Sequence, residues 1–230
     1  AGRMLTGRTP RNISALVSEH PTFDAFVGSI REESCQSGLP QFVSNKPRLK
    51  GGGQAWLGPT SGPFVVDLLT PKMAQLPIGP DFDRCDPEFS VANLDLHEQV
   101  AKRLNDRMTL LKAFDQFRRA LDSHPQIASS DRFQQRAVDL LSSSATRDAF
   151  DLDREPGSVR ERYGRNTLGQ SALLARRLVE AGSSMITLDW GRVSRKYATW
   201  DDHGDVHHIF DAMKSRAPIY DQALTALIED

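Results

Sequence analysis

The stretch that decides the fold reads Ser184-Met185-Ile186-Thr187-Leu188-Asp189-Trp190-Gly191. Residues 185–188 form a short, mainly apolar run directly after a helical pattern that ends at Gly182, and such a run predicts a buried strand. The sequence then turns polar at Asp189. Ligands of open parallel sheets bind beyond the carboxyl ends of the strands, so the segment that follows this strand is the candidate site.

Acidic and imidazole side chains gather further along this segment, where residues 200–208 read Trp-Asp-Asp-His-Gly-Asp-Val-His-His. The connection to the next predicted helix is longer than an ordinary β-to-α loop, which is typical of a binding loop. Carboxylate oxygen and imidazole nitrogen are both ligands of divalent metals, so Asp201 and His203, with Asp205 and His207 nearby, could bind one ion. The spacing equally fits a solvated acidic loop whose histidines cap the following helix, and both interpretations stay open.

The pattern before the strand is that of an amphipathic helix over residues 166–181, with Asn166 as its N-cap and Gly182 as its end. Helix, glycine, buried strand and polar loop form the repeating half-unit of a doubly wound α/β sheet flanked by helices. After the loop a further helix is expected, which Pro218 should kink or divide. Periodicity and turn signals also predict helices over 21–33, 105–121, 130–141, 145–150 and 157–163, and strands over 41–44 and 89–94.

Composition limits the classes of partner. The 230 residues contain 30 acidic and 29 basic side chains, so no overall charge favours nucleic acid. No apolar run approaches the roughly 20 residues that span a bilayer, and no signal peptide is visible. The two cysteines, Cys35 and Cys85, form no metal-binding pattern.

The chain begins at Ala1 without an initiator methionine and stops at Asp230 within a periodic helix, so we expect an internal fragment that lacks both ends.

Residues 45–95 are rich in glycine and proline and are expected to be a loop or lid insertion within one partial domain that spans 1–230. The segment Lys50-Gly51-Gly52-Gly53 invites comparison with phosphate-binding loops. It lacks the spacing of a Walker motif, and no helix follows it directly, so a surface loop is the better interpretation.

Three motifs together resemble a known family. They are Leu5-Thr6-Gly7-Arg8-Thr9-Pro10, the run from 162 to 182 that begins Arg-Tyr-Gly-Arg-Asn-Thr-Leu-Gly-Gln-Ser, and Asp189-Trp190-Gly191 followed by Trp-Asp-Asp-His-Gly-Asp at 200–205. The chain is similar, over nearly its whole length, to an uncharacterised "domain of unknown function" family of exported bacterial proteins in the alkaline phosphatase and sulfatase superfamily. The resemblance implies an α/β/α sandwich of the alkaline-phosphatase type, incomplete here, with a mostly parallel sheet and metal ligands at the carboxyl ends of its strands.

The resemblance also implies a site and a reaction. Asp201 and His203 match the family's Asp-x-His segment and would bind a divalent zinc, calcium, magnesium or manganese ion. Asp189 would support these ligands, and the nucleophile would precede Ala1. Asp202 stands where the family usually has a hydroxyl residue. Further candidates that would support the ligands or contact substrate are Asp202, Asp205, His207 and Arg192.

The expected activity is hydrolysis of small anionic phosphate or sulfate esters, in which a bound cation neutralises ester oxygens and activates a hydroxyl group. Arg192 and its basic neighbours Arg195 and Lys196 could attract such an anion, or could lie in a solvated loop. The alternative is an exported, non-catalytic binding or scaffold protein that retains the fold. By the same resemblance, the protein is expected in the periplasm or beyond it.

Overall fold

The computed structural model describes residues 6–8, 19–32, 39–45, 53–58, 61–66, 109, 143–188 and 208–230. Ten regular elements lie within these residues. In chain order they are α2 (Phe23–Glu32), β1 (Phe42–Ser44), the 3-10 helix η1 (Ala55–Leu57), β2 (Phe64–Val65), α5 (Ser144–Phe150), the 3-10 helix η4 (Leu152–Arg154), α6 (Gly157–Tyr163), α7 (Thr167–Glu180), β3 (Met185–Thr187) and α8 (Ile209–Glu229).

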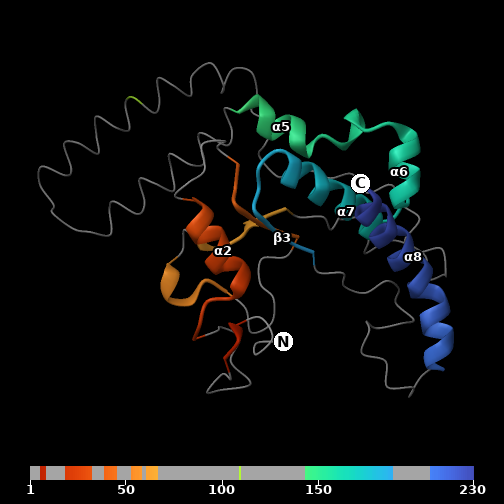
Figure 1. The fold of residues 1–230 in the computed structure, drawn as a ribbon, viewed down its shortest axis with the longest axis horizontal. Helices are drawn as coiled ribbons and strands as arrows, with labels where there is room; N and C mark the ends of the chain where they lie inside the picture. The colour runs from red at the N-terminus through yellow and green to blue at the C-terminus, as the bar shows by residue number, and fades with distance from the viewer. Residues whose placement is uncertain are drawn as a thin grey trace, which may run out of the picture.

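The three strands form a parallel sheet in the order β2-β1-β3. Val43 lies opposite Phe64 on one side and Ile186 on the other, so β1 is the central strand. Figure 1 shows α2 on one side of this sheet and the group α5 to α8 on the other. The predicted mixture of helices with a parallel sheet is therefore confirmed. Strand β2 lies inside residues 45–95, the segment whose composition predicts a loop or lid.

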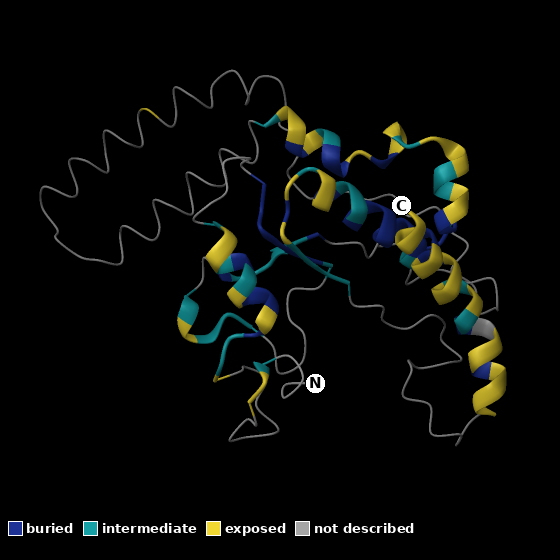
Figure 2. Cartoon of the chain, in the orientation of Figure 1, coloured by how far each residue is buried: buried dark blue, intermediate teal, exposed yellow. Residues whose placement is uncertain are grey.

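Helix α7 fills the centre of the molecule, as its pattern predicts. Asn166 caps it, because the side-chain carbonyl accepts the N–H of Gly169 at 2.8 Å. At the other end Gly182 adopts a positive φ of 112°, and the N–H of Ser183 closes the turn on the Leu178 carbonyl. Figure 2 shows α7 as the most continuously buried helix. Its buried residues include Ala172, Leu173, Leu174 and Leu178.

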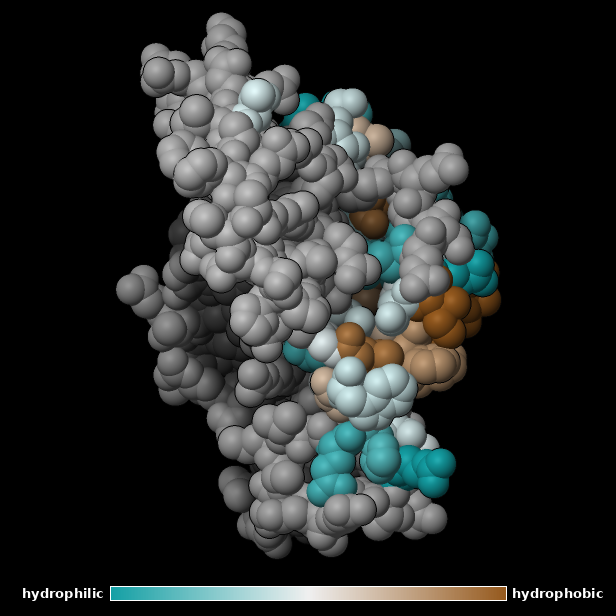
Figure 3. Space-filling view, turned by 90° about the vertical axis from the view of Figure 1, so that its left-hand side faces the viewer, coloured by the Kyte–Doolittle hydropathy of each residue, from teal (hydrophilic) through white to brown (hydrophobic). Residues whose placement is uncertain are grey.

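Helix α2 packs closely on the sheet through Gly28. A Cβ atom added there would lie 2.6 Å from the Cβ of Phe42 in β1, so a larger residue would push the helix away. The opposite side of α2 carries large apolar residues that remain exposed, Phe23, Phe26 and Ile30. Figure 3, viewed from the left-hand side of Figure 1, shows hydrophobic side chains gathered towards one edge of the described surface.

Helix α8 runs from Ile209 to Glu229 with Pro218 inside it, so of the two alternatives, a kink or a new helix at Pro218, the new helix is wrong. The helix buries only a narrow stripe, made of Ala212, Arg216, Ala223 and Ala226. In the part of the chain that is described, no helix is long and apolar enough to cross a membrane. The predicted strand over 89–94 and the predicted helices over 105–121 and 130–141 lie outside the described residues.

Candidate functional site at the carboxyl edge of the sheet

Strands β1 and β3 end side by side, because Ser44 pairs with Thr187 in the parallel register. The N–H of Asn45 donates to the Thr187 carbonyl at 3.3 Å, and the N–H of Val66 donates to the Ser44 carbonyl at 2.9 Å. These bonds align the carboxyl ends of β1, β2 and β3 with one another. Their carboxyl ends therefore form one common edge, which is where parallel sheets place ligands.

A buried carboxylate lies at this edge. Asp24, in the first turn of α2, is only 4% exposed, and its Oδ2 accepts the Thr187 hydroxyl at 3.0 Å. Its Oδ1 accepts the N–H of Ala25 at 2.9 Å. No lysine, arginine or histidine of the described residues forms an ion pair with Asp24. The sequence pattern missed this residue, because an acid in the first turn of a helix is typical of helix starts in general.

The site residues predicted from sequence all lie outside the described residues. They are Asp189, Arg192, Asp201, Asp202, His203, Asp205 and His207. The structure describes both flanks of this segment, since β3 ends two residues before Asp189 and α8 begins at Ile209. Within the described residues alone, no group of three or more histidine, cysteine, aspartate or glutamate side chains could hold a metal ion.

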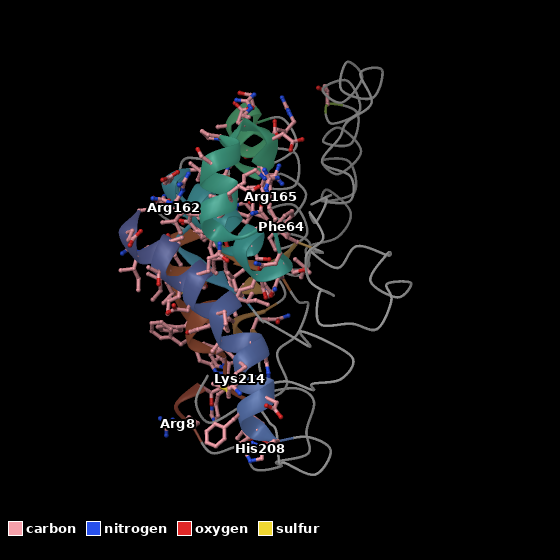
Figure 4. The ribbon with its side chains drawn as sticks, turned by 90° about the vertical axis from the view of Figure 1, so that its right-hand side faces the viewer. Arg8, Phe64, Arg162, Arg165, His208 and Lys214 are labelled. Carbon is pink, nitrogen blue, oxygen red and sulfur yellow. The ribbon has the colours of Figure 1, made fainter. Side chains whose placement is uncertain are left out.

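The histidine that ends this segment has a structural role. The Nδ1 of His208 accepts the N–H of Phe210 at 3.4 Å, so His208 caps α8, and its ring lies 5.2 Å from that of Phe210. Figure 4 shows His208 and Lys214 at one end of α8, with Arg162 and Arg165 towards the other. The helix-capping interpretation therefore holds for His208. His203 and His207 lie outside the described residues.

The opposite edge of the sheet is also polar, but its hydrogen bonds are internal. The side-chain amide of Gln41 donates to the carbonyls of Leu39 and Gly182, each at 3.1 Å, and its oxygen accepts the Ser184 hydroxyl at 2.6 Å. The Ser183 hydroxyl bonds the Pro40 carbonyl at 2.8 Å. These hydrogen bonds hold β1 and the start of β3 together at the amino edge of the sheet.

The long motif at 162–182 has a packing role in the structure. Gln170 is fully buried, and its amide donates to the carbonyls of Arg160 and Gly164 while its oxygen accepts the Arg160 Nε–H at 2.9 Å. A Cβ atom at Gly169 would lie 2.1 Å from the Tyr163 carbonyl oxygen. The motif thus fixes the tight junction between α6 and α7.

A second charged cluster joins the helices. Asp230 accepts hydrogen bonds from Arg162, from the Tyr163 hydroxyl at 2.9 Å and from Arg176 at 2.6 Å. Burial raises the pKa of Tyr163 above its ordinary 10.0, and the nearby guanidinium groups of Arg176 and Arg162 oppose this rise. Each arginine here has an acidic partner, so the cluster fastens α8 to α6 and α7.

Two of the polar side chains described at the carboxyl edge, Asp24 and Thr187, are joined by a hydrogen bond. The carboxylate of Asp24 and the hydroxyl of Thr187 suit magnesium, manganese or calcium, which prefer oxygen ligands. The imidazole ligand that zinc would favour is expected from His203, which lies outside the described residues. Of the triple glycine, only Gly53 is described, and its carbonyl accepts the N–H of Thr22 at 3.0 Å.

Comparison with known proteins adds one finding. The model of a family described as "Protein of unknown function (DUF1501)" matches residues 2–230, which is nearly the whole chain. No curated protein and no solved structure matches this chain.

Proposed function

The chain belongs to the family of proteins of unknown function DUF1501, and from this starting point we propose that it is a metal-dependent hydrolase of phosphate or sulfate esters. The proposal rests above all on the carboxyl edge of the sheet, where β1, β2 and β3 end together. Strand β3 leads from this edge directly to Asp189 and then to the Asp201 and His203 pair. We propose the alkaline-phosphatase-like α/β/α sandwich as the complete fold, and an exported, periplasmic location.

The chemistry of the proposed site follows from its residue types. Asp201 and His203 would bind a divalent cation, and Asp189 would orient them by hydrogen bonding. When bound, the cation supplies positive charge to the ester oxygens and lowers the pKa of a coordinated hydroxyl group. Arg192 would attract the anionic ester, while Asp202, Asp205 and His207 would support the ligands or contact the substrate.

The test is turnover of aryl phosphates and aryl sulfates by the intact natural protein, with magnesium, manganese, calcium or zinc added in turn. We expect cation-dependent hydrolysis that falls by about a hundredfold or more in His203→Gln, because a lost ligand removes the cation from the reaction. His208→Gln is the matched control, since this neighbouring histidine caps α8, and its activity should change less than about threefold.

Two results would contradict the proposal. The first is no hydrolysis with any of the four cations, and the second is equal activity in His203→Gln and the wild type. Either result would favour the alternative, an exported binding or scaffold protein that retains the fold without catalysis.

A further inference from the structure

Helix α8 carries a second regular apolar stripe besides the narrow one that it buries. Figure 2 shows that most of the surface of α8 outside the buried stripe is exposed. The second stripe, here called the α8 seam, consists of Phe210, Met213, Ala217, Tyr220, Leu224 and Leu227. Ala217 is half-buried, and each of the five larger side chains is between 37% and 66% exposed. A continuous exposed apolar stripe of this length is typical of a contact surface.

The spacing of the α8 seam is that of a coiled coil. Its members follow one another in alternating steps of three and four residues, without a break from Phe210 to Leu227. This heptad repeat lines up side chains along one side of a helix, so that they pack between those of a second helix. Pro218 lies outside the seam at an exposed position, and α8 continues through it. The pattern therefore indicates a helix as the partner of the seam.

The sizes of the side chains favour a second copy of α8 in the antiparallel direction. In that alignment the small Ala217 faces the large Tyr220 of the other copy at the centre of the seam, and Met213 faces Leu224 in the next layer. Small and large side chains opposite one another fill a contact without gaps. A parallel alignment would instead place two alanines in one layer and two tyrosines in another, which leaves a gap beside a crowded layer.

Opposite charges beside the seam favour the same alignment. Lys214 and Asp221 occupy equivalent heptad positions on one side of the seam, and both are exposed. The described ion pair of Lys214 is with Asp211 at 3.9 Å, and the Lys214 side chain remains 81% exposed, so its ammonium group can also reach a second helix. In the antiparallel alignment each Lys214 lies level with Asp221 of the other copy. Two-fold symmetry makes this attraction occur twice.

We infer that the α8 seam is the contact between two copies of this chain, paired antiparallel about a two-fold axis. A lipid surface suits the seam less well, because its exposed charged neighbours are three acids and one base, Asp211, Asp221, Glu229 and Lys214, and anionic lipids attract basic helices. The seam is about 25 Å long, which is short for a coiled coil. The contact therefore belongs with small, weak interfaces, and we expect association only above about 10 µM.

Sedimentation velocity of the intact natural protein, from about 1 µM to about 200 µM, tests the inference. The wild type should pass from monomer to dimer. Lys214→Glu and Asp221→Lys each place like charges opposite one another, so each should weaken association by about tenfold or more. An equal mixture of the two variants should associate as the wild type does, because the acidic side of one variant then faces the basic side of the other.

Glu229→Lys is the matched control. It changes the charge by the same amount as Asp221→Lys, at an exposed position of α8 outside the seam, and it should associate as the wild type does. Leu224→Lys is a second variant that does not depend on the charge pairs. It places a charge in two layers of the seam, because each copy contributes one, and it should abolish association over this range.

Three results would overturn the inference. The first is a wild type that stays monomeric at about 200 µM, which would leave the seam to another partner. The second is association that Leu224→Lys does not change, and the third is a mixture of the charge variants that associates no more strongly than either alone. Circular dichroism shows whether each variant folds, and the wild-type measurement needs no variant. Ester hydrolysis enters none of these measurements, so the inference stands or falls separately from the proposed function.

Discussion

Arg176 connects two carboxylates from distant parts of the chain: its Nη1 lies 2.6 Å from Asp230 Oδ2, and its Nη2 lies 2.9 Å from Glu155 Oε1. Arg177 donates to the same Glu155 oxygen. All these side chains are largely shielded from solvent, so water screens their attraction less than it would at the surface. The cluster therefore belongs to the structural core of the helical layer.

Arg176→Met should lower the free energy of unfolding by about 2 kcal/mol, because hydrogen bonds to two shielded carboxylates are lost. Urea unfolding followed by circular dichroism measures the change. The matched control is Lys214→Met, whose ion pair with Asp211 is exposed on both sides, and it should cost less than about 0.5 kcal/mol. Equal losses in the two variants would show that the Arg176 cluster contributes no more than a surface ion pair.

Gln170→Leu should lower the free energy of unfolding by about 2 to 3 kcal/mol. Its buried amide bonds the carbonyls of Arg160 and Gly164, and leucine can replace the volume but not the donors. Gln222→Leu is the comparison, because Gln222 also donates to a carbonyl, that of Glu161, but at an exposed position. We expect less than about 1 kcal/mol there. A Gln170→Leu variant as stable as the wild type would contradict the role given to the long motif.

Gly169→Ala should lower the free energy of unfolding by about 3 kcal/mol or prevent folding. The added Cβ would collide with the backbone carbonyl of Tyr163, which cannot move aside as a flexible side chain could. Gly157→Ala meets nothing closer than the Arg165 side chain at 3.8 Å. That control should stay within about 1 kcal/mol of the wild type, in the stabilising direction, because alanine favours helix more than glycine does. Thermal unfolding of both variants would decide the point.

Tyr163 should make stability fall at alkaline pH. Because burial raises its folded pKa above 10.0, the unfolded chain loses the phenolic proton first. Its contribution is therefore complete below the unfolded pKa and is lost as the pH rises through the higher folded pKa. Urea titrations between about pH 8 and about pH 11 should show this slope in the wild type and a shallower one in Tyr163→Phe. The phenylalanine variant should also lose about 1 kcal/mol at neutral pH with the bond to Asp230.

Tyr163→Phe differs from the wild type by one hydroxyl group, so the wild type is the control for this titration. A slope that persists in Tyr163→Phe would assign the alkaline instability to other groups.

Local patterns predicted the α7 and β3 unit correctly because the signals that define it are local. Asn166 and Gly182 act within one turn of the residues that they cap, and the apolar spacing between them repeats at the helical period. The parallel direction of the sheet also followed from the order of helix and strand. For these elements, neighbouring residues carry most of the information.

The remaining features depend on contacts that the local pattern does not contain. Strand β2 has only two residues, and it pairs with β1 from within a segment whose glycines and prolines favour a loop. Asp24 reaches its partner Thr187 across 163 positions. Pro218 removes one backbone hydrogen-bond donor, but α8 continues through it. Buried residues of α8 on both sides of Pro218, Arg216 and Ala223, hold the helix against the rest of the chain.

The hydrogen bonds to Asp230 make one end of α8 harder to unfold than the other. Helix ends ordinarily fray first, yet three side chains from α6 and α7 hold the last residue described here. At the other end, a single exposed imidazole, that of His208, caps the helix. Hydrogen exchange should therefore proceed along α8 from Ile209 towards Glu229, with the slowest amides shared by α6, α7 and the end of α8 as one cooperative unit.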